Sequence, residues 1–185
     1  RIMHNYNPLR YVLDLFKLYL PYPASTLFLY MIGFYILLLV LKVDKWLSIV
    51  GAIGFGFPSF FIIIIVAGHV TQALAISYVP AVFAGLILVC RGNYFLGGAL
   101  LGLFSGLELY SNHPQITYYL FLLMVIYVIF EFIERFKLKQ YKEIFKMTAI
   151  FLLVAVLAVG ANMANLWNTY EYAKHTIRGP SELTS

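Results

Sequence analysis

The sequence predicts an all-α fold, a polytopic bundle of transmembrane helices with one further amphipathic helix beside the membrane. Hydrophobic residues make up 62% of the chain and charged residues only 11%, whereas soluble domains are about 25% charged. The apolar residues form long runs without the alternation of barrel strands, and in lipid only helices and closed barrels satisfy their backbone hydrogen bonds. Lipid is therefore the expected solvent for most of this surface.

Six apolar runs predict six spans, because a helix needs about 20 mostly apolar residues to cross a bilayer. Glycines and Pro58 in the second run predict close packing and a kink. The third run is the weakest, since its apolar part (78–90) is too short alone. Either its helix extends backwards and is kinked at Pro80, or residues 69–77 lie flat or re-enter. The expected spans are 26–41, 46–66, 71–90, 94–110, 116–133 and 147–166.

The basic residues indicate an orientation, because cytoplasmic loops carry an excess of Lys and Arg. Eight of the 13 basic residues lie in the loops after the first, third and fifth spans: Lys42, Lys45, Arg91, Arg135, Lys137, Lys139, Lys142 and Lys146. The internal loops on the other side carry none. We therefore expect these three loops to be cytoplasmic and both ends of the sequence to lie outside.

An amphipathic segment precedes the first span. Arg10, Asp14 and Lys17 share one face of a helix over residues 9–20, with Leu and Val elsewhere. It is expected to lie on the outer membrane surface. The predicted organisation is an outer segment (1–25), a transmembrane bundle (26–166) and a second outer segment (167–185). Because the sequence has neither an initiator Met nor a closing helix, we expect it to be an internal part of a longer chain.

Polar side chains other than Lys, Arg and Glu gather on the predicted outer side. All four histidines lie there, together with three segments rich in hydrogen-bonding groups (68–72, 111–119 and 162–178). The net charge of +5 comes from short loops between apolar runs, so no nucleic-acid partner is expected. The sequence has no P-loop, no dinucleotide glycine motif, no Gly-x-Ser-x-Gly and no His-Glu-x-x-His, which argues against ATPases, redox enzymes and soluble-type hydrolases.

Glu108 is the most informative single residue, since it lies about one turn inside the outer end of its span. An ionised carboxylate there costs on the order of 3 kcal/mol on insertion scales, so it should face the bundle interior or a wet cavity. Such a group can act as a general base, a metal ligand or an acceptor for a substrate hydroxyl. The alternative is a structural hydrogen bond between helices, or a carboxylate that reaches the interface.

Two histidines are further candidates for catalytic roles. His113 opens the tight link between two spans, where Pro114 can start the next helix and Asn112 or His113 can cap it. His69 follows a glycine at the end of a span. Alternatively, each histidine lies at the membrane interface and makes its hydrogen bonds with neighbouring groups, without a functional role. Glu108, His69 and His113 together offer ligands for a divalent cation, but their spacing matches no standard motif, and no metal ligand is assigned.

Aromatic and basic residues on the same side have two interpretations each. Tyr118, Tyr119 and the Trp and Tyr residues of 167–172 fit the aromatic belt at a membrane interface, and the same rings can stack on sugars. Lys174 and Arg178 can hold a lipid phosphate, or they are ordinary surface charges.

Three segments resemble the bacterial YfhO-like membrane protein family. They are Gly68-His69 with 75–80 (AISYVP), 107–119 (LELYSNHPQITYY), and 165–184, which matches best through its Thr-Tyr-Glu-Tyr and its Arg-Gly-Pro-Ser-Glu-Leu-Thr. The similarity covers essentially all 185 residues and looks closest to Bacteroidetes-type members.

The family consists of longer proteins that are similar to GT-C-type glycosyltransferases. These enzymes move a sugar from a polyprenyl-phosphate donor on the outer face of the bacterial cytoplasmic membrane. The resemblance therefore implies a GT-C-like fold, a lipid-linked sugar as donor, an envelope acceptor, and partners in the rest of a longer chain or in a membrane complex. It also implies a catalytic Asp upstream of residue 1, a position that Asp14 does not match.

The resemblance also suggests roles for individual residues. Family members tend to read Gly-His-Asn-x-Lys after the second span, whereas this chain has Val70 and Gln72, so a Lys for the donor phosphate is missing. The predicted catalytic residues, which would line the cleft, are Glu108, His113 and His69. The predicted substrate-binding residues are Asn112, Gln115, Tyr118, Asn165, Glu171, Lys174 and Arg178.

Two other functions remain open at this stage. A transporter or flippase for a lipid-linked or anionic solute would carry polar residues to the midplane and beyond, where this chain is almost wholly apolar. A non-catalytic membrane subunit of an envelope complex would present flat apolar faces and no cavity around Glu108.

Overall fold

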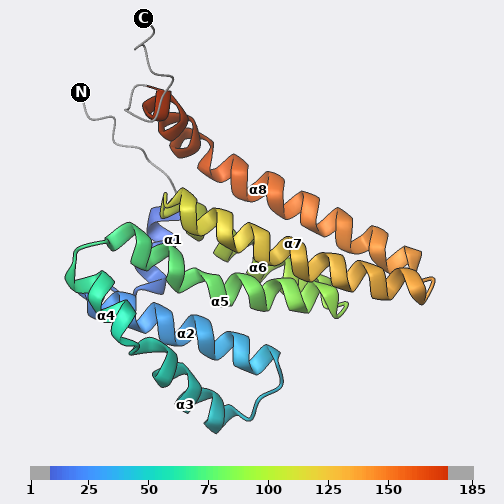
Figure 1. Ribbon diagram of the computed structural model, residues 1–185, viewed down its shortest axis with the longest axis horizontal. Coiled ribbons are helices and arrows are strands. Elements are labelled where there is room, and N and C mark those ends of the chain that lie inside the picture. Colours follow the sequence, from blue (N-terminus) through green and yellow to red (C-terminus); the bar gives the residue numbers. More distant parts are fainter. Residues whose placement is uncertain (1–8, 175–185) are drawn as a thin grey trace, which may run out of the picture.

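A computed structural model describes residues 9–174, and in this range the chain consists of helices and their connections, with no strand (Figure 1). The all-helical prediction is therefore confirmed for the described residues. The helices are α1 (Leu9–Phe16), α2 (Ala24–Val40), α3 (Lys45–Gly56), α4 (Ser59–Val66), α5 (Val70–Cys90), α6 (Tyr94–Tyr110), α7 (Pro114–Lys137) and α8 (Tyr141–Lys174).

Three of the described helices, α5, α7 and α8, are long and apolar enough to cross a membrane. The pair α3 and α4 makes a fourth span if it counts as one, and it is bent by 47° at the predicted position beside Pro58. The helices α2 and α6 have 17 residues each, or about 26 Å, against a hydrocarbon core of about 30 Å. The described residues are thus compatible with a helical membrane bundle, and they contain fewer clear spans than the six predicted.

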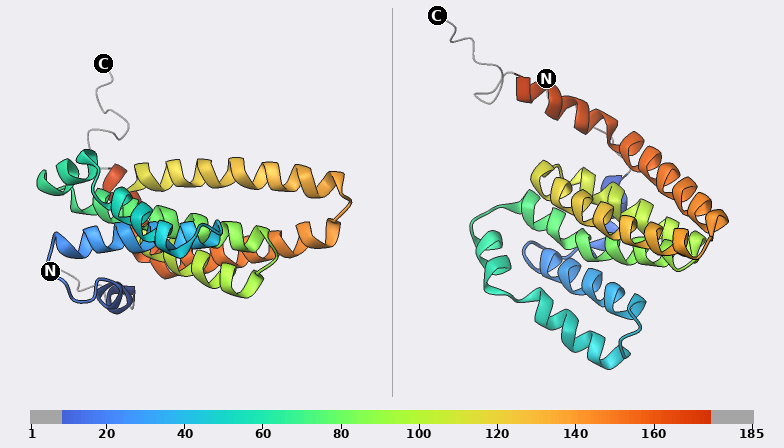
Figure 2. Two further views of the ribbon diagram at one scale, coloured as in Figure 1. Left: turned by 90° about the horizontal axis from the view of Figure 1, so that it is seen from below. Right: turned by 45° about the vertical axis from the view of Figure 1, so that its right-hand side comes forward.

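The third predicted span is a continuous helix. The helix α5 runs from Val70 through Pro80 to Cys90, so the re-entrant alternative for residues 69–77 is not what the structure shows. It is the core of the bundle: α2 packs on one side of it and α6 on the other, α3 lies beyond α2, and α8 lies against α6 (Figures 1 and 2).

Glycine allows α5 and α6 to approach closely. A Cβ atom on Gly85 would lie 2.5 Å from the backbone N of Leu101, and one on Gly97 would lie 2.6 Å from the backbone N of Val89. Small residues at such contacts bring membrane helices together, where packing replaces the hydrophobic effect as the attractive force.

The helix α1 is shorter than the predicted segment 9–20. Its apolar face packs on the bundle, because Leu13 is buried and the ring of Phe16 meets that of Phe104 edge-on at 5.4 Å. Tyr11 and Leu15 remain exposed. The helix α1 thus packs directly on α6, and its position on the membrane surface stays a prediction.

The helix α8 is longer than the predicted span 147–166. Its 34 residues extend to Lys174, so the expected boundary at 166–167 falls inside one helix. Figure 2 shows α8 running at an angle to the other helices, and Asn162 in its second half still donates to the carbonyl of Gly106 at 2.9 Å.

The predicted cytoplasmic loops lie at one end of the bundle, which we call the basic end. Arg91 donates to the carbonyl of Val40, and Arg135 donates to that of Cys90, so the ends of α2, α5 and α7 are held together. The opposite end, where α6 meets α7, is called the Glu108 end. Which membrane face each end occupies stays a prediction.

Candidate functional site

Glu108 is buried between α6 and α7, as the sequence predicted for a carboxylate at this depth. Its side chain is 2% exposed, and the hydroxyl of Thr117 donates to it at 2.9 Å from Oε1 and 3.2 Å from Oε2. The same hydroxyl lies 3.3 Å from the carbonyl of His113. One hydroxyl proton cannot fill the roughly four acceptor positions of a carboxylate, so Glu108 keeps capacity for another donor.

A cavity of about 620 Å³ begins at Glu108 and continues between α6, α7 and α8. Its polar lining residues are Ser105, Glu108, Thr117 and Thr148, and the others are apolar. The lining residues of α7 follow the i, i+3, i+4 pattern of one helix face from Thr117 to Phe132, a distance of about 22 Å at the helical rise. The volume is typical of ligand sites.

The cavity is open at its side. Phe121 and Leu152 line it and are each 63% exposed. The spans α7 and α8 are mostly uncovered, in contrast to α5, which is largely buried. In a bilayer this opening faces lipid tails or another protein segment. The arrangement is therefore an apolar groove that ends at one buried carboxylate.

Neither predicted catalytic histidine lines this groove. His69 is exposed at the residue before α5. His113 is half-buried at the residue before α7, where it makes no side-chain capping bond, and its Nδ1 atom is buried without a partner among the described residues. The predicted group of Glu108, His69 and His113 thus shares one end of the bundle, and only Glu108 faces the groove.

Two predicted substrate-binding residues meet in a second, polar hollow at the Glu108 end. Asn112 and Asn165 line a pocket of about 380 Å³ together with Asn168, Thr169 and Tyr172. The hydroxyl of Thr169 donates to Asn112 Oδ1 at 3.0 Å, which joins α8 to the α6–α7 loop. Sequence reasoning missed Thr169 and Thr117 as site residues, although each is a hydroxyl within a turn or two of a predicted polar residue.

The remaining predicted binding residues are more scattered. Gln115 and Tyr118 are exposed, and Gln115 donates to the hydroxyl of Tyr119 at 3.3 Å. Glu171 is half-buried on α8, and the backbone of Lys174 ends that helix. Arg178 lies outside the described residues.

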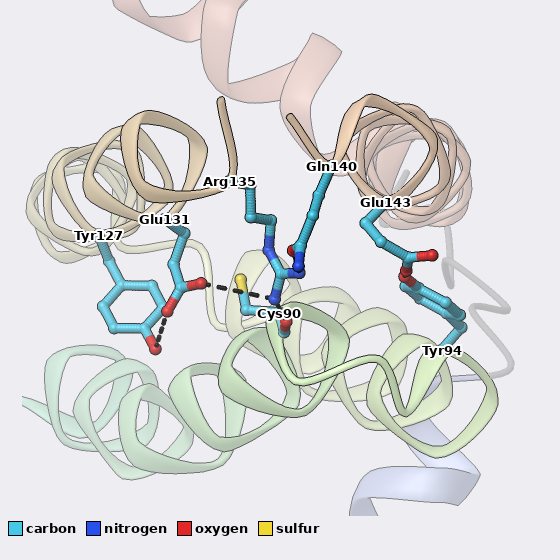
Figure 3. A network of polar contacts seen from close by, with 7 residues as sticks. All are labelled: Cys90, Tyr94, Tyr127, Glu131, Arg135, Gln140 and Glu143. Atoms are coloured by element: carbon cyan, nitrogen blue, oxygen red, sulfur yellow. Dashed lines mark hydrogen bonds and ion pairs between the residues drawn. The ribbon is translucent and has the colours of Figure 1, made fainter. Parts of the chain in front are cut away.

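A second polar network occupies the basic end (Figure 3). The guanidinium of Arg135 lies 3.7 Å from Glu131 and donates to Gln140 at 3.3 Å and to the carbonyl of Cys90. Tyr127 donates to Glu131 at 3.1 Å. These charge-assisted bonds join the side chains to one another and to the carbonyl of the last residue of α5. We call this group a structural clamp, because it holds α7 against the end of α5.

A parallel contact joins α6 to α8 beside this clamp. The hydroxyl of Tyr94 donates to Glu143 (Figure 3). Lys146 pairs with the same carboxylate at 3.1 Å. The sequence predicted three basic loops at this end but not the contacts between them, because Tyr94 and Glu143 are 49 residues apart.

Within residues 9–174 no group of three or more His, Cys, Asp or Glu side chains is placed to hold a metal ion. Comparisons of the chain with protein-family models, with curated proteins and with solved structures found no match. The resemblance to YfhO-like proteins therefore stays a prediction, and the function has to be argued from the geometry of the Glu108 end.

Proposed function

We propose that this chain is part of a membrane glycosyltransferase that moves a sugar from a polyprenyl-phosphate-linked donor to an envelope acceptor on the outer face of the bacterial cytoplasmic membrane. The observation that carries the proposal is the apolar groove that ends at Glu108. A lipid-linked sugar has a long hydrocarbon tail and a polar head, and the groove offers each a matching environment.

The dimensions of the groove agree with a lipid tail as its occupant. Its α7 wall is about 22 Å long, compared with about 15 Å for one leaflet, half of the hydrocarbon core. Exposed Phe121 and Leu152 give it an opening through which a tail can enter sideways from the bilayer. The head would then lie at the Glu108 end, beside the pocket lined by Asn112 and Asn165.

The role of Glu108 in this proposal is to position the substrate. The transfer breaks the bond between sugar and phosphate, forms a new glycosidic bond and releases polyprenyl phosphate, while a base takes the proton of the acceptor hydroxyl. The resemblance places that base upstream of residue 1. Glu108, already held by Thr117, accepts a further hydrogen bond from a hydroxyl of the donor or acceptor.

The two rival functions fit the groove less well. A flippase must carry a polar head past the midplane, and beyond Glu108, Ser105 and Thr117 the groove is apolar until Thr148. A purely structural subunit would bury this face in helix packing, and it would not need a carboxylate at the end of a groove.

The test uses the full-length protein in lipid nanodiscs, a polyprenyl-phosphate sugar with a photoreactive group in its tail, and Glu108→Gln. Crosslinks are expected on the α7 and α8 walls, and Leu152→Trp should reduce them by filling the groove. Glu108→Gln should slow sugar transfer about ten- to a hundredfold, the value of one hydrogen bond to a charged group. The crosslinks should persist in this variant.

Glu134→Gln is the matched control, because it makes the same chemical change at an exposed position near the other end of α7. Its transfer rate should equal that of the unmodified protein. If Glu108→Gln transferred sugar at the wild-type rate, the proposed role of Glu108 would be refuted. Crosslinks accompanied by movement of the head across the bilayer would favour the flippase, and a groove without crosslinks would favour the structural subunit.

A further inference from the structure

A separate cavity of about 530 Å³ lies beneath α1, and it shares no lining residue with the Glu108 groove. It is an open pocket, lined by α1 and the turn that follows it, by the first turn of α2 and by the start of α5. Its volume is within the range of small-molecule sites. Unlike the Glu108 groove, this cavity has charged residues of both signs in its wall.

Asp14 and Lys17 line this cavity without forming an ion pair with each other within 4.0 Å. Burial lowers the pKa of Lys17, and Asp14 compensates this effect only in part. Both side chains are half-buried. Two opposite charges that share a pocket but do not meet are each left short of a partner. A ligand that carries both charges would supply both partners.

Two hydroxyls complete the wall next to Lys17. The side chains of Ser25 and Thr26 are 3% and 1% exposed and line the cavity, and neither hydroxyl has a hydrogen-bond partner among the described residues. They lie in the first turn of α2, whose N-terminal end carries the positive pole of the helix dipole. The backbone amides of Ser25, Thr26 and Leu27 already donate to the carbonyls of Pro21 and Pro23. The donors left for a phosphate are the hydroxyl pair and the ammonium of Lys17, which suit it.

The surroundings indicate that the phosphate belongs to a lipid. Val70 and Leu74, at the start of a membrane-crossing helix, form the apolar side of the cavity. Tyr19 and Leu20 at its rim are 80% and 40% exposed. Aromatic and apolar groups around a polar pocket are typical of the level of lipid headgroups.

We propose that this cavity binds the zwitterionic headgroup of a phospholipid with a primary amine, such as phosphatidylethanolamine. The ammonium lies against Asp14, and the phosphate lies against Lys17 and the hydroxyls of Ser25 and Thr26. This site is independent of the proposed sugar transfer, and either proposal can fail without the other.

The experiment is native mass spectrometry of the full-length protein released from nanodiscs that contain equal amounts of phosphatidylethanolamine and phosphatidylglycerol. Phosphatidylethanolamine should be retained about tenfold or more over phosphatidylglycerol, which has the phosphate but no amine. Asp14→Asn should remove this preference and leave phosphatidylglycerol bound as before. Lys17→Gln should reduce retention of both lipids about ten- to a hundredfold.

The control is Arg10→Gln, which removes a charge from the same helix at an exposed position that does not line the cavity. It should retain lipid like the unmodified protein. The double variant Ser25→Ala with Thr26→Val should weaken retention without any change of charge. Equal retention of the two lipids by the unmodified protein, or unchanged selectivity in Asp14→Asn, would overturn the site. If an excess of soluble phosphoethanolamine displaced the lipid completely, the headgroup in the cavity would not need to belong to a lipid, and that part of the proposal would be wrong.

Discussion

Replacing Gly85 by Ala should separate the two central helices of the bundle. A Cβ atom at this position would lie 2.5 Å from the backbone N and 2.8 Å from the Cα of Leu101. Carbon atoms in contact need about 3.5–4.0 Å, so α5 and α6 must move apart by about 1 Å. Overpacking of this kind costs about 1–3 kcal/mol, and the lost contacts along the helix pair add to it.

Alanine also favours the helix over glycine by about 1 kcal/mol, so the net expectation is a loss of up to about 2 kcal/mol. The assay is reversible unfolding in mixed micelles, followed by circular dichroism. Gly54→Ala is the matched control, because Gly54 lies in α3 with nothing within 4 Å of its added Cβ. It should gain up to about 1 kcal/mol. If Gly85→Ala gains as much as the control, the close contact between α5 and α6 is wrong.

Three further predictions concern the two ends of the bundle. Asn162→Leu removes the bond from Asn162 Nδ2 to the carbonyl of Gly106 at 2.9 Å and should cost about 0.6–1.7 kcal/mol in the same unfolding assay. Arg135→Met opens the clamp of Figure 3 and should cost about 1–3 kcal/mol, whereas exposed Lys142→Met should change little; equal losses would contradict the clamp. For orientation, a membrane-impermeant maleimide on intact cells should label Asn112→Cys but not Lys142→Cys, both in a Cys90→Ala background, and the reverse pattern would invert the predicted topology.

The fold class and the helix order could be predicted because the apolar runs are long and the turn signals are clear. Pro58 marked the bend between α3 and α4 correctly. The end of α8 could not be predicted. Polar residues such as Asn165 and Thr169 looked like an outer segment, yet helix continues through them because Thr169 bonds both the carbonyl of Asn165 and Asn112 of the neighbouring loop. Tertiary contacts override composition here.

The site was predicted in part. The burial of Glu108 follows from one rule, the cost of a free carboxylate in lipid. Its partner Thr117 is nine residues away and adjacent only because the α6–α7 turn reverses the chain. The cavity beneath α1 depends on three segments from residues 14 to 74, and no spacing in the sequence indicates that they meet. Asp14 and Lys17 were interpreted as the wet face of a surface helix, whereas they are half-buried and line an open pocket.

The two ends of the bundle differ in how completely their polar groups are satisfied. At the basic end, charged side chains close on one another and on helix termini. Of the buried side-chain atoms that lack a partner among the described residues, only Arg135 Nε lies there, while Tyr30, Tyr78, His113 and Asn162 each contribute one nearer the Glu108 end. Such an atom costs about 1–3 kcal/mol when it is left dry. Four of these five atoms lie nearer the Glu108 end, so that end has more polar groups that water, lipid or a substrate could satisfy.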